Sequence, residues 1–369
     1  MEHRLTEAFK WLHMHPELAF EERETACFLR KALEEAGIEI LDAGTETGLI
    51  ARIVGNGPGR ITGLRCDIDA LPVKEETALP YASLTEGRMH ACGHDFHAAV
   101  MLGAALILKE TSDRWPGEVR IVFQPAEETA GGAEKVVSCG HLDDVTRFFG
   151  VHSYPAKPAG WLGIREGAVM AAVDRFAIRI RGRGTHAAQP HKGIDPIIVQ
   201  AAMVQSLQTV VSRSMDPFSH SLISITHVES GNTWNVIPET AFLEGTVRTL
   251  DASDRATIEA RMRAIVSSTA EAYGAQAEMD WIPGPPAVVN DSALAEQSAA
   301  LAREMGFEVG RQEDTMTGED FSLFLDGRPG VFIRVGTDGG YPLHHPKFTV
   351  DPAAIYPAAR YFAALALMD

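Results

Sequence analysis

The 369-residue chain has little cysteine, a deficit of positive charge and no long apolar run. Its 4 cysteines are too few for a disulfide scaffold and fit reduced thiols in a cytoplasm. Against 33 Lys and Arg stand 50 Asp and Glu, and the net charge of −17 argues against nucleic acid or an anionic membrane as a partner. No run of about 18 apolar residues occurs, which excludes a membrane-spanning helix, and the charged amino terminus does not resemble a signal peptide. We therefore expect a cytoplasmic protein.

The residues that are present favour a folded chain with two domains. Hydrophobic residues make up 45% of the sequence, too many for a disordered protein. Because domains usually run about 100 to 200 residues, the length suggests more than one core. The first part alternates helical and strand-like runs: a helix over 28–36, strands over 48–54 and 61–66, a helix over 97–109, and strands over 119–123 and 147–151. This alternation predicts an α/β sheet.

A different pattern begins at about Asp174. The predicted elements are a strand over 176–180, a helix opened by Asp195-Pro196, strands over 222–228 and 241–249, a helix over 253–273 and a strand over 276–281. Their order, β-α-β-β-α-β, is typical of a split βαβ sandwich and is complete enough for an inserted domain. After residue 285 the α/β character returns, but the pattern alone leaves open whether residues 285–369 rejoin the first domain.

The densest cluster of chemically active residues is the segment from Met89 to His97. It holds three histidines, Cys92 and Asp95 between a loop and a predicted helix start. The Cys-x-His spacing places a thiolate and an imidazole close enough to bind one divalent cation or two adjacent ones. The alternative is that Cys92 is an inert buried thiol and His97 a hydrogen-bonding residue at the helix start.

Glu127 and Glu128 follow the strand that ends near Gln124. In open α/β sheets the carboxyl ends of the strands are where active sites form. Glu128 could be an oxygen ligand while Glu127 accepts a proton from water; the alternative is an ordinary acidic turn. His152 ends another strand, where a lone histidine is more often a satisfied core residue than a ligand.

Two acids, Asp67 and Asp69, lie at positions i and i+2 as a strand ends. On a strand they would share a face, so one could orient a ligand histidine; a turn acid is the alternative. Two further loops carry histidines, His186 in one, and His344 with His345 in the other. Neither loop is persuasive alone, but cysteine, histidine and glutamate near strand ends together match the ligand set of a metal hydrolase.

With these residues, the sequence resembles the metal-dependent amidohydrolases related to aminoacylases, hippurate hydrolases and auxin-conjugate hydrolases. The resemblance covers nearly the whole chain, with its blocks in the correct order. They are His13 to Leu18, Asp67 to Pro72, Met89 to Asp95, Gln124 to Glu128, Asn235 to Pro238, Gly318 to Phe321, and His344.

The resemblance implies one catalytic α/β domain, formed by residues 1–173 and 285–369 around a mixed sheet with helices on both faces. Residues 174–284 would be an inserted α+β lid that also mediates homodimerisation. One or two divalent ions (Zn, Mn, Ni or Co) would be bound by Cys92, His94, Glu128, His152 and His344. Glu127 would be the general base and Asp69 its helper.

The resemblance also implies roles for three residues of the lid. His186, contributed across the dimer, would help to stabilise the oxyanion. Arg248 and Asn235 would bind the free α-carboxylate of the substrate, which the planar guanidinium of arginine suits. The alternatives are a strand arginine in a surface ion pair and an asparagine in a turn.

The activity implied is hydrolysis of the amide bond of N-acyl-L-amino acids by metal-activated water, which releases a carboxylic acid and a free amino acid. Related carboxypeptidases carry His-x-Asp where this chain has Asp67-Ile68-Asp69, so His94 must supply the missing imidazole. His345 has no assigned role. The main alternative function is that of a dipeptidase or carboxypeptidase on small peptides. A second is a non-catalytic metal-binding scaffold, but the free carboxylate of Glu127 beside Glu128 argues against it. A third is a phosphoesterase, but the chain lacks the Asp and Asn ligands and the Arg and Lys residues expected around phosphate.

Overall fold

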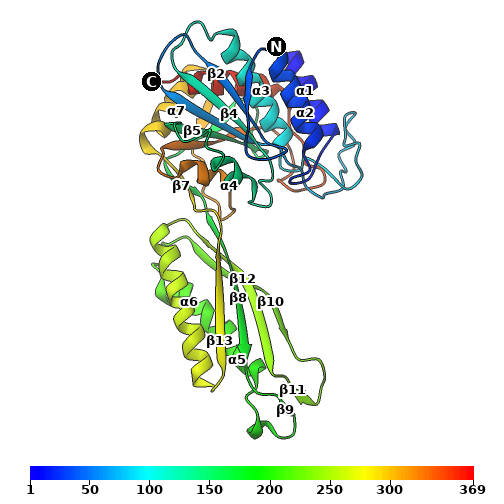
Figure 1. Ribbon diagram of the computed structural model, residues 1–369, viewed down its shortest axis with the longest axis vertical. Coiled ribbons are helices and arrows are strands. Elements are labelled where there is room, and N and C mark those ends of the chain that lie inside the picture. The colour runs from blue at the N-terminus through cyan, green and yellow to red at the C-terminus, as the bar shows by residue number, and fades with distance from the viewer. The chain divides into compact units, whose positions relative to one another are not determined.

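The computed structural model describes residues 1–369 and divides into two compact units (Figure 1). Unit 1 comprises Met1–Val169, Val288–Glu313 and Asp320–Asp369, and unit 2 comprises Met170–Ala287 and Asp314–Glu319. Each unit has a hydrophobic core of its own. None of the helices combines the length and the apolar character needed to cross a bilayer.

Unit 1 is built on an eight-stranded mixed sheet with the strand order β1-β2-β4-β3-β5-β16-β6-β15. The strands are β1 (Glu39–Leu41), β2 (Leu49–Val54), β3 (Ile61–Asp67), β4 (Glu118–Gln124), β5 (Arg147–Tyr154), β6 (Trp161–Gly163), β15 (Glu308–Gly310) and β16 (Gly330–Gly336). The four neighbours β4, β3, β5 and β16 run parallel, so their carboxyl ends meet at one edge. Because β16 pairs with β5, the C-terminal part of the chain joins the sheet that the first part begins.

Helices contact both faces of this sheet. They are α1 (Glu2–Met14), α2 (Arg23–Glu35), α3 (His94–Glu110), α4 (Gly132–Val137), α7 (Ser292–Glu304) and α8 (Ile355–Ala366), with short helices η3 (Asp320–Leu325) and η4 (Pro352–Ala354). The first face carries the main apolar core, under α3 and α8. The second face carries a cluster of aromatic rings with η3, in which Phe148 packs on Phe324 and Phe321 on Phe332. Two short strands, β7 (Gly167–Met170) and β14 (Val288–Asn290), form a separate ribbon.

Strand β3 shows how the fold buries charge. Leu64 and Cys66 belong to the apolar core under α3, whereas Arg65 and Asp67 alternate with them and point to the second face. All four side chains are fully buried because both faces of the sheet are covered. Buried charges require partners, and those partners lie around the candidate site.

Unit 2 is an antiparallel four-stranded sheet with the order β10-β12-β8-β13. Its elements are β8 (Ala172–Arg181), β9 (Thr185–His186), η1 (Pro190–Lys192), α5 (Pro196–Thr209), η2 (Val210–Ser214), β10 (Ser221–Ser230), β11 (Val236–Ile237), β12 (Thr240–Thr249), α6 (Ala252–Ala272) and β13 (Gln276–Pro283). The main elements follow the predicted β-α-β-β-α-β order. As the Asp195-Pro196 pair predicts, the Asp195 carboxylate accepts the N–H of Ile197 over 2.9 Å at the start of α5.

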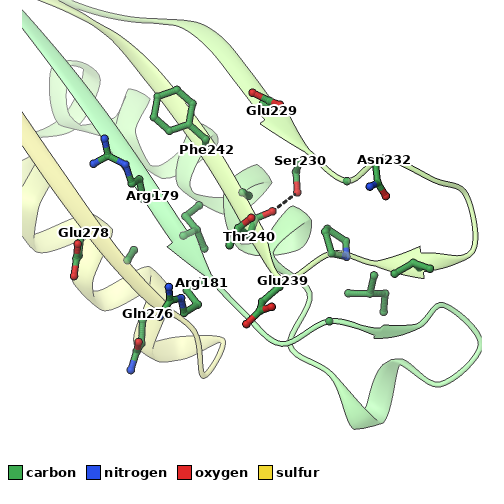
Figure 2. A pocket seen from close by; sticks show the side chains of 18 residues that line it. Arg179, Arg181, Glu229, Ser230, Asn232, Glu239, Thr240, Phe242, Gln276 and Glu278 are labelled. Carbon is green, nitrogen blue, oxygen red and sulfur yellow. Dashed lines mark hydrogen bonds between the residues drawn. The ribbon is translucent and has the colours of Figure 1, made fainter.

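The face of this sheet away from α5 and α6 is polar. Arg175 pairs with Glu244 of the neighbouring strand, and Arg179 pairs with Asp280. A hollow of about 980 Å³ lies at the end of this face nearest β11, and Arg179 and Phe242 are among its lining residues (Figure 2). Acidic and basic side chains both line the hollow, in contrast to the apolar core on the helical side.

Candidate metal centre

The candidate site lies in unit 1, at the edge where the parallel strands β3, β4 and β5 end. Strand β3 ends at Asp67 and β4 at Gln124. The residues that follow these ends include Asp69, Glu127 and Glu128. Because the carboxyl ends of parallel strands share one edge, acidic side chains from two strands converge there, as the sequence predicts.

Gly93 shapes the segment that connects Cys92 to His94. Its φ of +86° lies in the left-handed region, and a Cβ atom there would stand 2.7 Å from the hydroxyl oxygen of Ser153. Helix α3 therefore begins at His94 rather than at the predicted His97. The Ser153 hydroxyl donates to the carbonyl oxygen of Cys92 over 2.9 Å, which holds this bend against β5.

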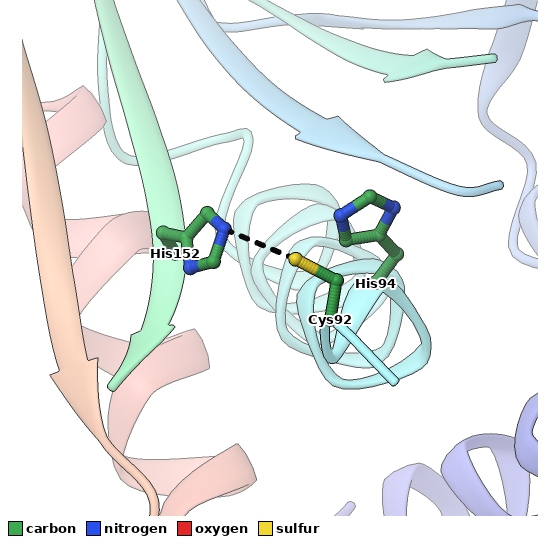
Figure 3. A group of neighbouring side chains, drawn as sticks. All are labelled: Cys92, His94 and His152. Atoms are coloured by element: carbon green, nitrogen blue, oxygen red, sulfur yellow. Dashed lines mark hydrogen bonds between the residues drawn. The ribbon is translucent and has the colours of Figure 1, made fainter. Parts of the chain in front are cut away.

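Cys92, His94 and His152 form a buried group (Figure 3). Their potential ligand atoms all lie within 4.8 Å of one another, and the Cys92 Sγ is 3.6 Å from the Nε2 of His152. His152 lies within β5, which continues to Tyr154 instead of ending at the histidine as predicted. The Nδ1 of His152 is 2.9 Å from the carbonyl oxygen of Ser153, which can only accept, so Nδ1 carries the proton and Nε2 presents a lone pair toward Cys92.

Glu128 and His344 extend this group. The ligand atoms of Cys92, Glu128 and His344 also lie within 4.8 Å of one another. The Oε1 of Glu128 is 3.4 Å from the Nε2 of His344 and 3.9 Å from the Nε2 of His94. The backbone N–H of His344 donates to the carbonyl oxygen of Ala91 over 2.7 Å, which ties this distant loop to the Cys92 segment. The structure thus brings the five predicted ligands together.

Asp69 lies behind the two glutamates. Its two carboxylate oxygens accept the backbone N–H groups of Glu127 and Glu128, each over 3.1 Å. Its Oδ1 is also 3.3 Å from the Nδ1 of His94. One carboxylate therefore fixes the turn that carries both glutamates and orients the His94 ring, which leaves the Nε2 of His94 for the other ligand atoms.

Two buried atoms at this site have no hydrogen-bond partner in the chain, the Nε2 of His94 and the Oε1 of Glu128. A buried polar atom left unpaired costs about 1–3 kcal/mol, so each of them calls for a ligand. A thiolate, imidazoles and a carboxylate are together a donor set for Zn²⁺ and similar divalent ions. The residues present therefore fit a metal.

The charges around the site also favour a cation. Burial lowers the pKa of His94, but the neighbouring charges of Asp67 and Cys92 outweigh it and hold this pKa well above its usual value. The negative field that draws a proton to His94 would equally attract a metal ion.

The family described as Peptidase family M20/M25/M40 matches residues 63–368. The chain belongs to this family. N-acetylcysteine deacetylase of Bacillus subtilis (strain 168) is 45% identical over 366 residues, which cover 99% of this chain and 96% of the relative. N-acyl-L-amino acid amidohydrolase of Geobacillus stearothermophilus is 43% identical over 289 residues, 77% of this chain and 78% of the relative.

A solved structure supports the same assignment. The Bacillus subtilis YXEP protein, described as a dinuclear metal binding peptidase from the M20 family, superposes with a TM-score of 0.90 at 42% identity, and the match covers 99% of this chain and 97% of that one. The predicted family, the α/β fold and the assignment as a hydrolase are therefore confirmed. The roles of individual residues stay predictions.

Sequence reasoning missed the support beneath this M20 site. Arg65 donates to Gln124 Oε1 over 2.7 Å, to Asp67 Oδ2 over 2.9 Å and to Asp320 Oδ1 over 2.7 Å. Asp67 is also 2.5 Å from the Nδ1 of His97. The only sequence signal was the alternation of Arg65 and Asp67 along β3 and the acid of the Gly318 to Phe321 block.

His97 belongs to this support and not to the ligand set. Its Nε2 accepts the backbone N–H of Ser153 over 2.7 Å, so its Nδ1 is the donor to Asp67. With both ring nitrogens engaged, His97 has no lone pair left for a metal. The predicted alternative, a hydrogen-bonding histidine near the helix start, describes it correctly.

The three predicted substrate-contacting residues lie in unit 2, at two separate places. His186 of β9 pairs with Val236 of β11, and the carbonyl oxygen of Asn235 accepts the N–H of Ala187 over 3.0 Å, so His186 and Asn235 are neighbours. Arg248 and Thr240 lie near opposite ends of β12, and the strand between them spans about 26 Å at about 3.3 Å per residue. One chain therefore does not bring Arg248 and Asn235 to the same carboxylate.

His345, which had no predicted role, stabilises a turn. Its Nδ1 accepts the backbone N–H of Lys347 over 3.0 Å, and its ring stacks on Tyr341 with 4.6 Å between centroids. These contacts shape the loop that presents His344.

Proposed function

We propose that this chain hydrolyses the amide bond of N-acyl-L-amino acids and releases a carboxylic acid and a free amino acid. The observation that carries the proposal is the group of Cys92, His94, Glu128, His152 and His344 beside Glu127 at the edge of the sheet. The names of the deacetylase and amidohydrolase relatives support this substrate class.

The chain supplies the proton transfers. When bound, divalent ions would polarise the amide carbonyl and lower the pKa of water toward about 7. The Glu127 carboxylate accepts a proton from the attacking water and returns it to the amine nitrogen as the C–N bond breaks. Asp69 holds the backbone of Glu127 in place for both transfers.

The lid residues would recognise the substrate. Arg248 supplies a cation for the free α-carboxylate, and His186 a donor for the oxyanion. Because Arg248 and the ribbon bearing His186 and Asn235 are at separate ends of β12, a single substrate would contact both only if the ribbon came from a second chain. This separation supports a homodimer formed through unit 2, the lid and dimerisation domain.

The metal would be Zn, Mn, Ni or Co, in one or two sites. All four cysteines are free, which fits a thiol ligand kept reduced in a cytoplasm. A mixed set of thiolate, imidazole and carboxylate does not select one of these ions by itself.

A turnover screen tests the function. Acetyl-, benzoyl- and indoleacetyl-amino acids would be assayed beside dipeptides, with the enzyme reconstituted in Mn, Zn, Co or Ni. We expect metal-dependent release of free amino acid from the acyl substrates and a loss of it after chelation. Turnover of dipeptides with none of the acyl-amino acids would show the alternative, a dipeptidase or carboxypeptidase.

Replacing Cys92 with alanine should lower the bound metal per chain, measured by elemental analysis after dialysis, because the only sulfur ligand is lost from a group within 4.8 Å. Cys27→Ala is the matched control, since Cys27 is an exposed free thiol far from these ligands in sequence. Unchanged metal content in Cys92→Ala would refute the ligand role.

A further inference from the structure

His13, in the last turn of α1, is a buried histidine whose two ring nitrogens each contact a carboxylate. Its Nδ1 is 2.6 Å from Asp95 Oδ2, and its Nε2 is 3.3 Å from Glu75 Oε1. The His13 side chain is 3% exposed, and those of Asp95 and Glu75 are 1% and 6% exposed. Carboxylates only accept, so both nitrogens donate and His13 is an imidazolium between two anions.

The contact of His13 with Asp95 connects it to the segment that bears the proposed ligands Cys92 and His94. Asp95 follows His94 directly in the first turn of α3. Its second oxygen, Oδ1, accepts the N–H of Phe96 over 2.8 Å, so the carboxylate is fixed on both sides. A shift of Asp95 would therefore move the backbone that carries His94.

The contact of His13 with Glu75 connects it to the loop that bears His344. Glu75 accepts the N–H of Ser83 over 2.6 Å and the hydroxyl of Thr77, which closes a loop around the carboxylate. The next residue, Glu76, donates its N–H to the carbonyl oxygen of Pro346 over 2.8 Å. Pro346 lies two residues after His344.

We propose that His13 is a positioning residue of the metal centre, which joins the segment bearing Cys92 and His94 to the loop bearing His344. The ligands come from segments far apart in the chain, and a buried ion-paired bridge fixes their separation where packing alone would leave it adjustable. This inference rests on the proposed metal-dependent function. It also gives a role to the His13 to Leu18 block, which the proposed mechanism does not use.

Two substitutions separate the arms of the bridge. In His13→Asn the amide stands near the position of Nδ1 and reaches only toward Asp95, whereas in His13→Gln it stands near Nε2 and reaches only toward Glu75. Residues that orient metal ligands typically change metal affinity by about 10- to 100-fold when they are replaced. We expect each variant to bind Co²⁺ at least about tenfold more weakly in competition with a chelator.

The matched control is His15→Asn. His15 belongs to the same segment, but its Nδ1 is 2.6 Å from the carbonyl oxygen of Trp11 and its ring stacks on the Trp11 ring at 4.3 Å. It contacts no carboxylate of the bridge, so its Co²⁺ affinity should equal that of the wild type. Glu75→Gln, which leaves the pair of His13 and Asp95 intact, provides a second test should the His13 variants fail to fold, with the same expected direction.

Activity gives a readout that a purely structural role would not change. With limiting Co²⁺ the His13 variants should lose kcat at unchanged KM, and saturating Co²⁺ should restore it. Unchanged Co²⁺ affinity in folded His13 and Glu75 variants would overturn the positioning role. A wild-type chain that binds no Co²⁺ and hydrolyses no acyl-amino acid would instead overturn the proposed function.

Discussion

Replacing Glu127 with glutamine should lower kcat by about 10²- to 10⁴-fold, the range expected for loss of a general base. Glutamine has nearly the same shape as glutamate but cannot accept the proton of water. The backbone N–H of residue 127 would still donate to Asp69, so the turn before Glu128 should persist. Metal content should therefore equal that of the wild type.

Two further substitutions make this result specific. Glu134→Gln makes the same chemical change at an exposed position of α4 and should leave kcat unchanged. Glu128→Gln should lower the metal content, because the Oε1 of Glu128 lies 3.4 Å from the Nε2 of His344 and 3.9 Å from the Nε2 of His94, among the proposed ligand atoms. Full turnover in Glu127→Gln would show that Glu127 is not the general base. Loss of metal in that variant would show that Glu127 is a metal ligand instead.

The elements that sequence could predict are those with local signals. The alternation of Phe176, Ile178 and Ile180 with polar residues indicates the first strand of unit 2, and the Asp195-Pro196 pair indicates the start of α5. The cluster from Met89 to His97 was visible because its residues are adjacent in the chain. In each case the evidence lies within a few residues, which is the range over which periodicity and capping act.

The contacts that sequence could not predict are long-range. Arg65 donates hydrogen bonds to Gln124, which is 59 positions away in the sequence, and to Asp320, which is 255 positions away. His13 contacts Asp95, which is 82 positions away. Arginine is mostly exposed in proteins and histidine is intermediate, so the residue type alone predicts neither the burial nor the partner. Helix α3 also began earlier than predicted, because the left-handed Gly93 permits a start directly after Cys92.

Replacing Arg65 with methionine should destabilise unit 1 by about 3–5 kcal/mol, the range for removing one partner of a buried ion pair. Methionine fills much of the same volume, so the loss is chiefly electrostatic. Asp67 and Asp320, both fully buried, would lose the cation that lies 2.9 and 2.7 Å from them. Chemical denaturation of the metal-free protein, followed by circular dichroism, measures the change. Arg30→Met, at an exposed pair with Glu34, should cost less than about 0.5 kcal/mol.

The pH dependence identifies the cause of this loss. Burial raises the pKa of Asp320 from 3.8 to about 6, and the charge of Arg65 acts in the opposite direction. Removing Arg65 would raise this pKa further, so in the variant the folded chain holds the Asp320 proton at a pH where the unfolded chain has lost it. The folded variant is therefore destabilised most at pH values above the raised pKa of Asp320. This destabilisation disappears as the pH falls toward the pKa of Asp320 in the unfolded chain. The stability difference between wild type and Arg65→Met should narrow between pH 8 and pH 5, and a pH-independent difference would show that lost packing, rather than an uncompensated buried carboxylate, is responsible.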